Sequence, residues 1–410
     1  MSPDGHNGGM MTILGNNLSS VRRENLAMVL ELVHRRRSVS RAALTIATGL
    51  NRSTIAALVA ELVVGEFVIE RSPDATNSVG RPSPLVCPHP GLVVIAVNPE
   101  VDAITAGVVG LAGVVVERER HPVDHVLSPQ EAIARIGAIV TGLSAGRRVV
   151  AVGLAVPGLV RATDGVVRWA PHLDWTDEPV AALLEAATGF PVVAANDASL
   201  GAIAEQLFGA GRDTRDLVYL NGGASGIGGG VIANGAPVGG VGGYAGEFGQ
   251  NRPGILDPAD QRAPGGTLED EVSRSRLLDV ARLRTADEEQ LSRVLRESTD
   301  PSLRAELARQ VRVLSVALSN VINVLNPQLV VLGGFLADVR ASDPDALAAL
   351  VARQSIAASF EGVRILPAEL GSDRLLIGAA ELAFAGLLAD PAGHRPAAPQ
   401  PAGSSPQVGE

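Results

Sequence analysis

The apolar residues between positions 40 and 62 are spaced as in two short helices joined by a tight turn. The turn falls at Gly49, because glycine readily adopts the left-handed conformations that such a turn requires. Ser40 and Asn51 stand where the two helices would begin, and their side-chain oxygens can cap a first turn. A third helix is predicted over residues 21–33 and would cover the pair. The apolar positions of the pair are Leu44, Ala47, Leu50, Ile55, Leu58, Val59 and Leu62.

Two segments typical of β-strands follow these helices. Residues 67–70 and 85–87 are mainly apolar, and the polar residues 71–82 between them predict a loop. The two segments therefore predict a hairpin, and three helices followed by a hairpin predict a winged helix-turn-helix, a class of DNA-binding domain. Because any amphipathic pair of helices shows the same apolar spacing, the added hairpin is what favours DNA binding.

In this class of domain the second helix of the pair lies in the major groove of DNA. Its first residues, Arg52, Ser53 and Thr54, would then face bases or phosphates. Arginine also suits phosphate contacts and a narrow minor groove, whose negative potential attracts a guanidinium group. We therefore predict phosphate contacts from Arg22, Arg23 and Arg41, and a minor-groove contact from Arg81 near the tip of the hairpin.

The rest of the chain alternates short apolar runs with helical patterns, which predicts an α/β body. Two groups of strands, each followed by helices, indicate two lobes with a cleft between them, and ligands favour such clefts. The ends are rich in Gly, Pro, Ser and Ala and predict disorder. The predicted segments are a disordered tail at 1–17, the winged helix-turn-helix at 18–90, the body at 91–389 and a disordered tail at 390–410. Within the body, one lobe covers about 91–200 plus the C-terminal helix, and the other about 201–375.

Composition limits the possible sites and partners. With 410 residues, 46% of them hydrophobic, the chain can build more than one core. Cys87 is the single cysteine, which excludes an internal disulfide and any site with several cysteine ligands. No secretory signal or membrane-length apolar run is evident, so we expect a cytoplasmic protein without membrane contact. Residues 1–90 hold nine arginines and seven acidic residues, about +2, and the remainder about −12, within a net charge of −10. The charge favours DNA contact by the first part alone.

Six glycine-rich and polar motifs in the body occur in the order seen in the ROK family of repressors, open reading frames and kinases. The winged helix-turn-helix in front makes the chain resemble the repressor branch, and the resemblance covers about residues 18 to 389. It implies a two-lobed fold of the actin-like ATPase type around a sugar cleft. The motifs are GLAVPG at 153–158, APHLDW at 170–175, NDA at 196–198 with Glu205, GIGGG at 226–230, AGEFG at 245–249 and NPQLVVLGG at 326–334.

The resemblance also implies sugar-binding residues. Asn196 and Asp197 match the family's sugar-contacting pair, whose carboxylate takes a proton from the sugar in the kinases. Glu247 and Glu269 match its other sugar-contacting acids, and Gln250 can reach a sugar hydroxyl. Carboxylates and amides suit this task because they accept hydrogen bonds from hydroxyl groups. By itself the Asn-Asp pair is more typical of a turn after a strand, and only the surrounding motifs favour a sugar site.

Two departures from the family argue against catalysis. Residues 98–102, Asn-Pro-Glu-Val-Asp, replace the glycine-rich turn that cradles ATP phosphates in the kinases. Proline lacks an N–H donor and the two acidic side chains repel polyphosphate, so we expect neither ATP binding nor enzyme activity. The family's zinc ligands are replaced by Gln250, Asp260, Arg262 and Thr267, so we expect no metal. Without zinc, the segment 249–269 would be ordered by packing or by ligand, and its prolines and glycines predict a mobile segment, which bears on the position of Glu269.

Three functions are compatible with these residues. The first is a repressor that binds double-stranded operator DNA as a homodimer or a dimer of dimers and responds to a sugar or sugar phosphate. The second is an active sugar kinase with an added DNA-binding domain, in which Asp197 would be the general base. The third is a DNA-binding protein whose body serves dimerisation alone. The departures at residues 98–102 favour the first.

Overall fold

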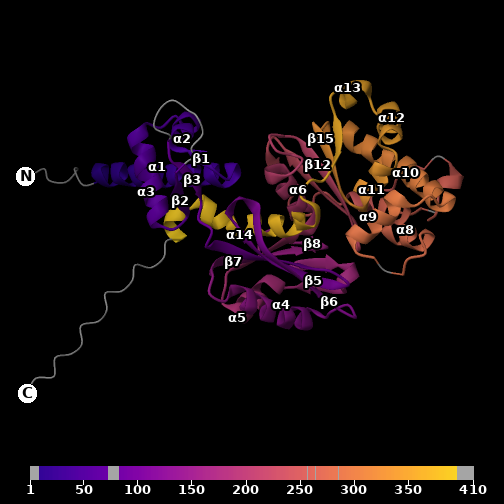
Figure 1. Cartoon of the computed structure of the whole chain (residues 1–410), viewed down its shortest axis with the longest axis horizontal. Helices are drawn as coiled ribbons and strands as arrows, with labels where there is room; N and C mark the ends of the chain where they lie inside the picture. The colour runs from indigo at the N-terminus through magenta and orange to yellow at the C-terminus, as the bar shows by residue number, and fades with distance from the viewer. Residues whose placement is uncertain (1–8, 73–82, 256, 264, 285, 395–410) are drawn as a thin grey trace, which may run out of the picture. The chain divides into compact units, whose positions relative to one another are not determined.

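The computed structural model describes residues 9–72, 83–255, 257–263, 265–284 and 286–394 (Figure 1). The chain forms two compact units. We call them the head unit, which comprises residues up to His89 and those from Ala385 onward, and the body unit, Pro90–Phe384. In the part of the chain described, no single helix is long and apolar enough to cross a membrane. Only the bent pair formed by residues 41–48 and 52–64 meets that test, by length and composition alone.

The head unit contains three helices and a three-stranded antiparallel sheet. Its elements are α1 (Gly9–Arg36), β1 (Val39–Ser40), α2 (Arg41–Thr48), α3 (Arg52–Val64), β2 (Val68–Arg71) and β3 (Leu85–Pro88). Strands β2 and β3 pair as the predicted hairpin, with Val68 opposite Pro88 and Arg71 opposite Leu85. The short strand β1, which the sequence did not predict, adds to the other edge of β3.

The predicted caps and turn shape the helix pair α2 and α3. The Ser40 hydroxyl accepts a hydrogen bond from the Ala43 N–H at 3.1 Å, and the Asn51 side chain accepts one from the Thr54 N–H at 2.8 Å. Gly49 ends α2 with a φ of 70°, and the helix axis bends by 115° between α2 and α3. Of the apolar positions predicted for the pair, Ala47 is exposed and Leu50 half-buried. The buried apolar residues of α1, α2 and α3 include Leu26, Val29, Leu30, Val33, Leu44, Ile55, Leu58, Val59 and Leu62.

The ends of the chain differ from the prediction. Helix α1 begins at Gly9, so residues 9–17 are helical and not a disordered tail. At the other end, Pro391–His394 form a short 3-10 helix that contacts α1, so the predicted tail does not begin at Asp390. Residues 385–389 group with the head unit, although the body was predicted to extend to 389. Residues 1–8 and 395–410, together with Arg81, lie outside the described residues.

The body unit contains two five-stranded sheets of identical topology. In each sheet the first three strands of the chain form an antiparallel meander, and the next two strands add, in parallel, on the side of the first strand. The strand orders are β11-β7-β4-β5-β6 and β14-β13-β12-β15-β16. The first sheet consists of β4 (Leu92–Pro99), β5 (Ala103–Gly110), β6 (Val114–Pro122), β7 (Arg148–Val156) and β11 (Val192–Asn196). The second consists of β12 (Leu217–Gly223), β13 (Gly226–Ala233), β14 (Ala236–Pro237), β15 (Leu329–Gly334) and β16 (Arg364–Pro367). The predicted two-lobed α/β body is confirmed.

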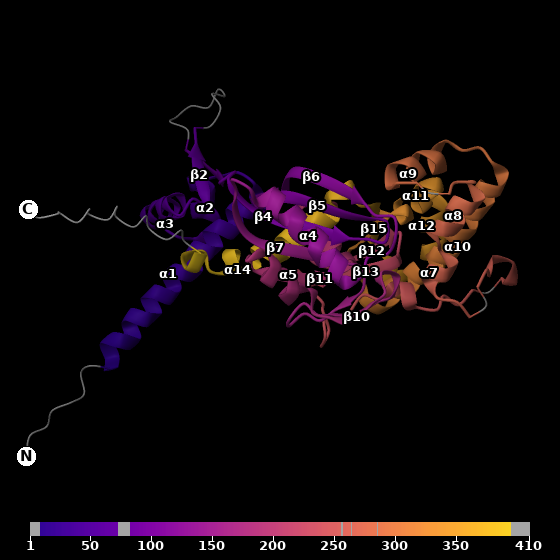
Figure 2. The ribbon, with the colours of Figure 1, turned by 90° about the horizontal axis from the view of Figure 1, so that it is seen from below.

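Helices cover both sheets. In the first lobe α4 (Pro129–Ser144) and α5 (Val180–Thr188) lie side by side (Figure 1), and both contact strands of the first sheet. Helix α6 (Asp197–Phe208) packs mainly on β12 and β13. Figure 2 shows a group of helices gathered in the second lobe. They are α7 (Leu268–Glu271), α8 (Arg274–Val280), α9 (Glu288–Glu297), α10 (Pro301–Leu325), α11 (Phe335–Ser342), α12 (Pro344–Gln354) and α13 (Ala357–Phe360).

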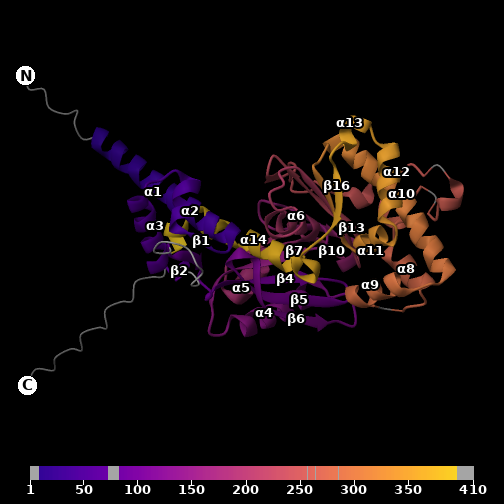
Figure 3. The ribbon, with the colours of Figure 1, turned by 45° about the horizontal axis from the view of Figure 1, so that its top comes forward.

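The last helix, α14 (Arg374–Ala389), begins in the body and runs beside strands of the first sheet (Figure 3). Gly153 of β7 makes this approach possible, because a Cβ there would overlap the Ala379 carbonyl group. A small third sheet, of β8 (Leu159–Val160), β9 (Val167–Ala170) and β10 (Trp175–Glu178), follows β7 in the chain. The close packing of α14 on β7 matches the prediction that the C-terminal helix belongs to the first lobe.

Candidate functional site

One pocket of about 70 Å³ in the body brings together the residues predicted to contact sugar. They come from four elements: the last residue of β11, the first residue of α6, the 3-10 helix η3 (Phe248–Gln250) with the residue before it, and α7. Gly226 and Gly228 of β13 complete the wall beside them. The predicted residues that line this pocket are Asn196, Asp197, Glu247, Gln250 and Glu269.

Asn196 and Asp197 have both roles that the sequence suggested: they form the turn between β11 and α6, and they line the pocket. The Asn196 side-chain oxygen caps α6 by accepting a hydrogen bond from the Ser199 N–H at 2.9 Å, and its amide donates to the Gly158 carbonyl at 3.1 Å. One Asp197 oxygen accepts from the Ala198 N–H at 2.7 Å. Within the described residues the other oxygen has no hydrogen bond, and burial raises the pKa of this carboxyl. A hydroxyl donor entering the pocket would therefore meet an acceptor that the protein leaves unused.

Glu269 is held at the pocket by hydrogen bonds to two other wall residues. Its carboxylate accepts from the Ile227 N–H at 3.1 Å and from the Gln250 amide at 2.6 Å. Gly226, with a φ of 113°, lets the carboxylate approach, because a Cβ would overlap it. Glu247 lines the same pocket, and its pKa is raised by burial and by the charges of Asp197 and Glu269. Three carboxylates around one small pocket favour a ligand rich in hydroxyl groups.

A buried arginine orders the segment that carries Glu269. Arg309 of α10 is 2% exposed and donates to the Glu306 carboxylate at 2.7 and 2.9 Å, to the Glu271 carboxylate at 3.1 Å and to the Asp260 carbonyl at 2.7 Å. Arg312 holds the Asp260 carboxylate with two bonds of 2.6 and 2.7 Å. Ion pairs and hydrogen bonds thus hold the described residues of this segment, and its ordering by a ligand stays a prediction.

The residues at the family's zinc-ligand positions do not fit a zinc site. Asp260 is paired with Arg312, while Arg262 donates its backbone N–H to the Glu271 carboxylate and its guanidinium group to nearby carbonyls. Thr267 caps α7 together with Asp270. No cluster of three histidine, cysteine or acidic side chains that could hold a metal occurs in the described part of the chain. The positions that would bind zinc therefore hold one ion pair, side-chain and backbone hydrogen bonds, and a helix cap.

Among the other residues that line the pocket are Trp169 and His172, which the sequence analysis did not propose as sugar contacts. Trp169 of β9 is 47% exposed, although tryptophan is usually well buried. An exposed aromatic ring beside polar acceptors can pack on the apolar face of a sugar ring. The sequence offered a signal in the motif at residues 170–175, which places His172 close to the pocket. Trp175 of that motif is buried and donates to the Leu127 carbonyl at 3.0 Å.

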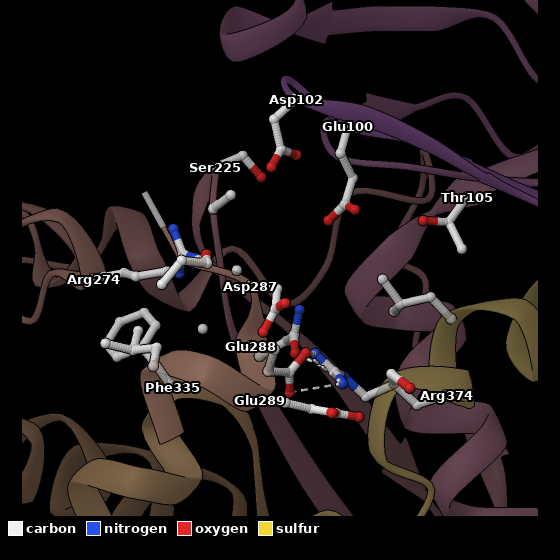
Figure 4. A pocket seen from close by; sticks show the side chains of 18 of the residues that line it. Glu100, Asp102, Thr105, Ser225, Arg274, Asp287, Glu288, Glu289, Phe335 and Arg374 are labelled. Atoms are coloured by element: carbon white, nitrogen blue, oxygen red, sulfur yellow. Dashed lines mark hydrogen bonds and ion pairs between the residues drawn. The ribbon is translucent and has the colours of Figure 1, made fainter. Parts of the chain in front are cut away.

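A second cavity, of about 420 Å³, adjoins this pocket and shares Asp197, Asn221 and Ser225 with it. Two of the residues that replace the family's phosphate turn, Glu100 and Asp102, lie here (Figure 4). Asn98 is buried and donates to the Ala155 carbonyl at 2.8 Å, while Glu100 and Asp102 line the cavity. Burial, with the charges of Asp102 and Asp197, raises the pKa of Glu100 to about 7. An acidic wall thus stands where a phosphate-binding turn would have to offer N–H groups.

The residues predicted to contact DNA differ in whether an ion pair engages them within the described residues. Arg52 and Ser53 are exposed at the start of α3, and no ion pair engages Arg52 within the described residues. The Ser53 hydroxyl and the Thr54 N–H both donate to Asn51. The arginines predicted to hold phosphates are paired with acidic residues of the same unit. The pairs are Arg22 with Glu61 at 2.6 Å, Arg23 with Asp390 at 3.9 Å and Arg41 with Glu70 at 2.5 Å.

Two lobes of identical topology around a polar pocket define the class of two-lobed, actin-like α/β proteins that includes sugar kinases. The sequence pattern of the ROK family matches residues 94–385, and the chain belongs to the ROK family. It is 26% identical over 403 residues to the putative xylose repressor of Caldicellulosiruptor sp. (strain Rt8B.4), covering 92% of this chain and 99% of that protein. It is 29% identical over 303 residues to the glucokinase of Streptomyces coelicolor, covering 68% of this chain and 94% of the enzyme.

Solved structures show the same fold. A ROK family transcriptional regulator described as a homolog of the E. coli MLC protein is similar with a TM-score of 0.71 and 22% identity, covering 90% of this chain and 98% of that one. A ROK family glucokinase from Streptomyces griseus, solved with glucose and AMPPNP, is similar with a TM-score of 0.59 and 27% identity. The match covers 72% of this chain and 100% of the glucokinase. The regulator thus covers a larger share of this chain than the kinase does.

Proposed function

We propose that this protein is a sugar-responsive transcriptional repressor. The observation that carries the proposal is the union in one chain of a ROK body with a head of three helices and a hairpin. The relative named a putative xylose repressor aligns over 92% of the chain. The glucokinase relative aligns over 68%, a length close to that of the body alone. A DNA-binding domain is required for transcriptional regulation, whereas sugar phosphorylation does not require one.

In this proposal the head is a winged helix-turn-helix that binds double-stranded operator DNA. Helix α3 enters the major groove with Arg52, Ser53 and Thr54 foremost. Because operators of such proteins have two-fold symmetry, the protein binds as a homodimer or as a dimer of dimers. Phosphate contacts from Arg22, Arg23 and Arg41 require these side chains to exchange carboxylate partners for phosphates, and Arg81 reaches the minor groove.

The body senses the sugar, and the pocket residues hold its hydroxyl groups. Asp197, Glu247 and Glu269 act as acceptors, while the amides of Asn196 and Gln250 can both donate and accept. The walls of the pocket come from both lobes, with Asn196 on the first sheet and Gly226 on the second. A bound sugar therefore favours one arrangement of the lobes, which is the differential binding that a response requires. Neither zinc nor ATP has a part in this mechanism.

A second candidate function is ATP-dependent phosphorylation of a sugar, favoured by the glucokinase relatives and by the position of Asp197 as a general base. Pro99, at the end of β4, has no N–H donor, and the carboxylates of Glu100 and Asp102, which line the cavity, repel a phosphate. We therefore expect no ADP formation above the sugar-free background in a coupled assay over a panel of sugars. The Streptomyces coelicolor glucokinase serves as the positive control. Sugar-dependent turnover near that of the control would contradict the repressor proposal as stated.

The DNA-binding face is tested by Arg52→Ala in a gel-shift titration, with a duplex selected by the wild-type protein from random sequences. Loss of a base-reading arginine costs about 1–3 kcal/mol, so we expect operator affinity to fall about 5- to 150-fold. Sugar binding, measured by calorimetry, should not change. Arg353→Ala, an exposed arginine of the body, is the matched control. Equal operator affinities of wild type and Arg52→Ala would refute the placing of α3 in the groove.

A body that serves dimerisation alone is distinguished by thermal shift over the same sugar panel. A ligand that binds the folded state raises the melting temperature by mass action. We expect at least one neutral sugar to do so in the repressor, whereas no member of the panel would do so if the body only dimerises.

A further inference from the structure

The larger cavity of the body has no assigned ligand. It has a volume of about 420 Å³, which lies within the range of small-molecule sites, and its walls come from β5, β6, β12, α9 and α14 (Figure 4). It adjoins the pocket proposed for sugar, because Asp197 and Asn221 line both.

Acidic groups predominate on the walls of this cavity. Seven carboxylates and four guanidinium groups line it, a formal charge of −3. The carboxylates are Glu100, Asp102, Asp197, Asp287, Glu288, Glu289 and Asp338, and the guanidinium groups are those of Arg118, Arg120, Arg274 and Arg374. An anionic ligand would have to enter against this charge.

The arginines leave most of the carboxylates unpaired. Arg120 bonds to Asp102 at 2.8 Å, and Arg374 to Glu288 at 3.1 Å. The other two bond elsewhere: Arg118 to the Ser372 hydroxyl at 2.8 Å and Arg274 to the Ala286 carbonyl. Within the described residues no ion pair engages the remaining five carboxylates of the cavity, which are Glu100, Asp197, Asp287, Glu289 and Asp338.

Glu100 is the carboxylate that points most clearly to a ligand. Its side chain extends into the cavity (Figure 4), it is largely buried, and no described residue donates a hydrogen bond to it. A buried carboxylate without a partner is costly unless a cation or donor reaches it. The folded chain therefore presents, inside the cavity, a carboxylate acceptor that none of its described residues satisfies.

The distribution of the carboxylates indicates the kind of cation. They are spread around the cavity, and in the part of the chain that the structure describes no three of them converge as a metal site requires. An elongated cation with separated charges can pair with several of them at once. We propose that this cavity binds an organic diamine or polyamine, whose protonated amino groups pair with Glu100 and with carboxylates on the opposite wall.

Calorimetry on the full chain at pH 8 tests the proposal with 1,6-hexanediamine as the probe and 1,6-hexanediol as its neutral match. At that pH Glu100 is ionised, because its pKa is about 7. We expect the diamine to bind and the diol not to bind. Glu100→Gln should weaken diamine binding at least about 10-fold, because a buried charge pair is lost. Glu361→Gln, an exposed carboxylate outside the cavity, should leave it unchanged.

Four results would overturn the proposal: no binding of the diamine, equal binding of diamine and diol, equal diamine affinities of wild type and Glu100→Gln, or Mg²⁺ binding with the same dependence on Glu100. The last would identify a metal site. Thermal melting of each variant without ligand shows whether it is folded, so a loss of binding is not mistaken for a loss of structure. None of these measurements depends on DNA or sugar binding, so they succeed or fail independently of the proposed repressor function.

Discussion

Replacing Arg309 with methionine should lower the free energy of unfolding by about 3–5 kcal/mol, the usual cost of breaking a buried ion pair by removal of one partner. Arg309 is 2% exposed, and its loss leaves the buried carboxylates of Glu271 and Glu306 without their cation. Urea unfolding of the full chain, followed by circular dichroism, measures the effect. Arg312→Met is the matched control, because it lies on the same helix but is 48% exposed. Its expected cost is about 1 kcal/mol or less.

The same pair of variants tests how Glu269 is held in place. Asp260 and Glu271, which Arg309 fixes, stand on either side of the start of α7, where Glu269 lies. If the ion pairs order this segment, Arg309→Met should also weaken sugar binding at a temperature at which the variant remains folded. Equal costs for the two variants would show that Arg309 contributes no more than an exposed arginine, and would contradict its structural role.

Asp197→Ala should abolish the sugar response while leaving operator binding intact. A hydrogen bond to a charged group contributes about 1.5–3 kcal/mol, so we expect sugar affinity to fall about 10- to 150-fold. Gel-shift titration with the sugar that shifts the wild-type melting temperature measures the response. Asp345→Ala, an exposed residue of α12, is the control. A normal response of Asp197→Ala would place the ligand elsewhere in the molecule.

Removing the Asp197 carboxylate should raise the stability of the folded chain, although it lowers the affinity for sugar. Burial raises the pKa of this carboxyl in the folded chain above its ordinary value of 3.8. Between these two pKa values the folded state holds a proton that the unfolded chain has lost, so this group makes stability fall as pH rises. Asp197→Asn removes the charge, and we expect it to melt at a higher temperature than wild type at neutral pH without sugar. A lower melting temperature would mean that the ionised carboxylate stabilises the fold.

Local chemistry explains why the head could be predicted closely. Ser40, Gly49 and Asn51 act through the backbone of their own neighbours, and each occupies the predicted position in the structure. The strand β1 was not predicted, because two residues carry no periodic pattern and its pairing with β3 spans more than 40 positions. The start of α1 was placed too late, because Gly and Asn at residues 15–17 are poor helix formers.

The sugar pocket of the body, in contrast, depends on contacts between residues that are far apart in the sequence. The family resemblance placed five polar residues in one pocket, yet Trp169 and the Arg309 cluster were missed. Arg309 lies among apolar residues of α10 and pairs with Glu271, 38 positions away. No pattern along the chain signals that pairing, since it exists only when α7 and α10 pack together. The exposure of Trp169 likewise depends on which distant residues pack against it, and no local pattern predicts that.

The sequence alone determined what depends on neighbours in the chain: the helix pair with its caps, the hairpin, the alternation of strands and helices, and the loss of the phosphate turn and zinc ligands. The tertiary structure decided which charges meet. It paired three predicted phosphate-binding arginines with acids, paired Asp260 with Arg312, and left Glu100 and four other carboxylates around one cavity without an ion pair within the described residues. The reason is physical, since the energy of a charge depends on burial and on partners that folding brings from distant parts of the chain.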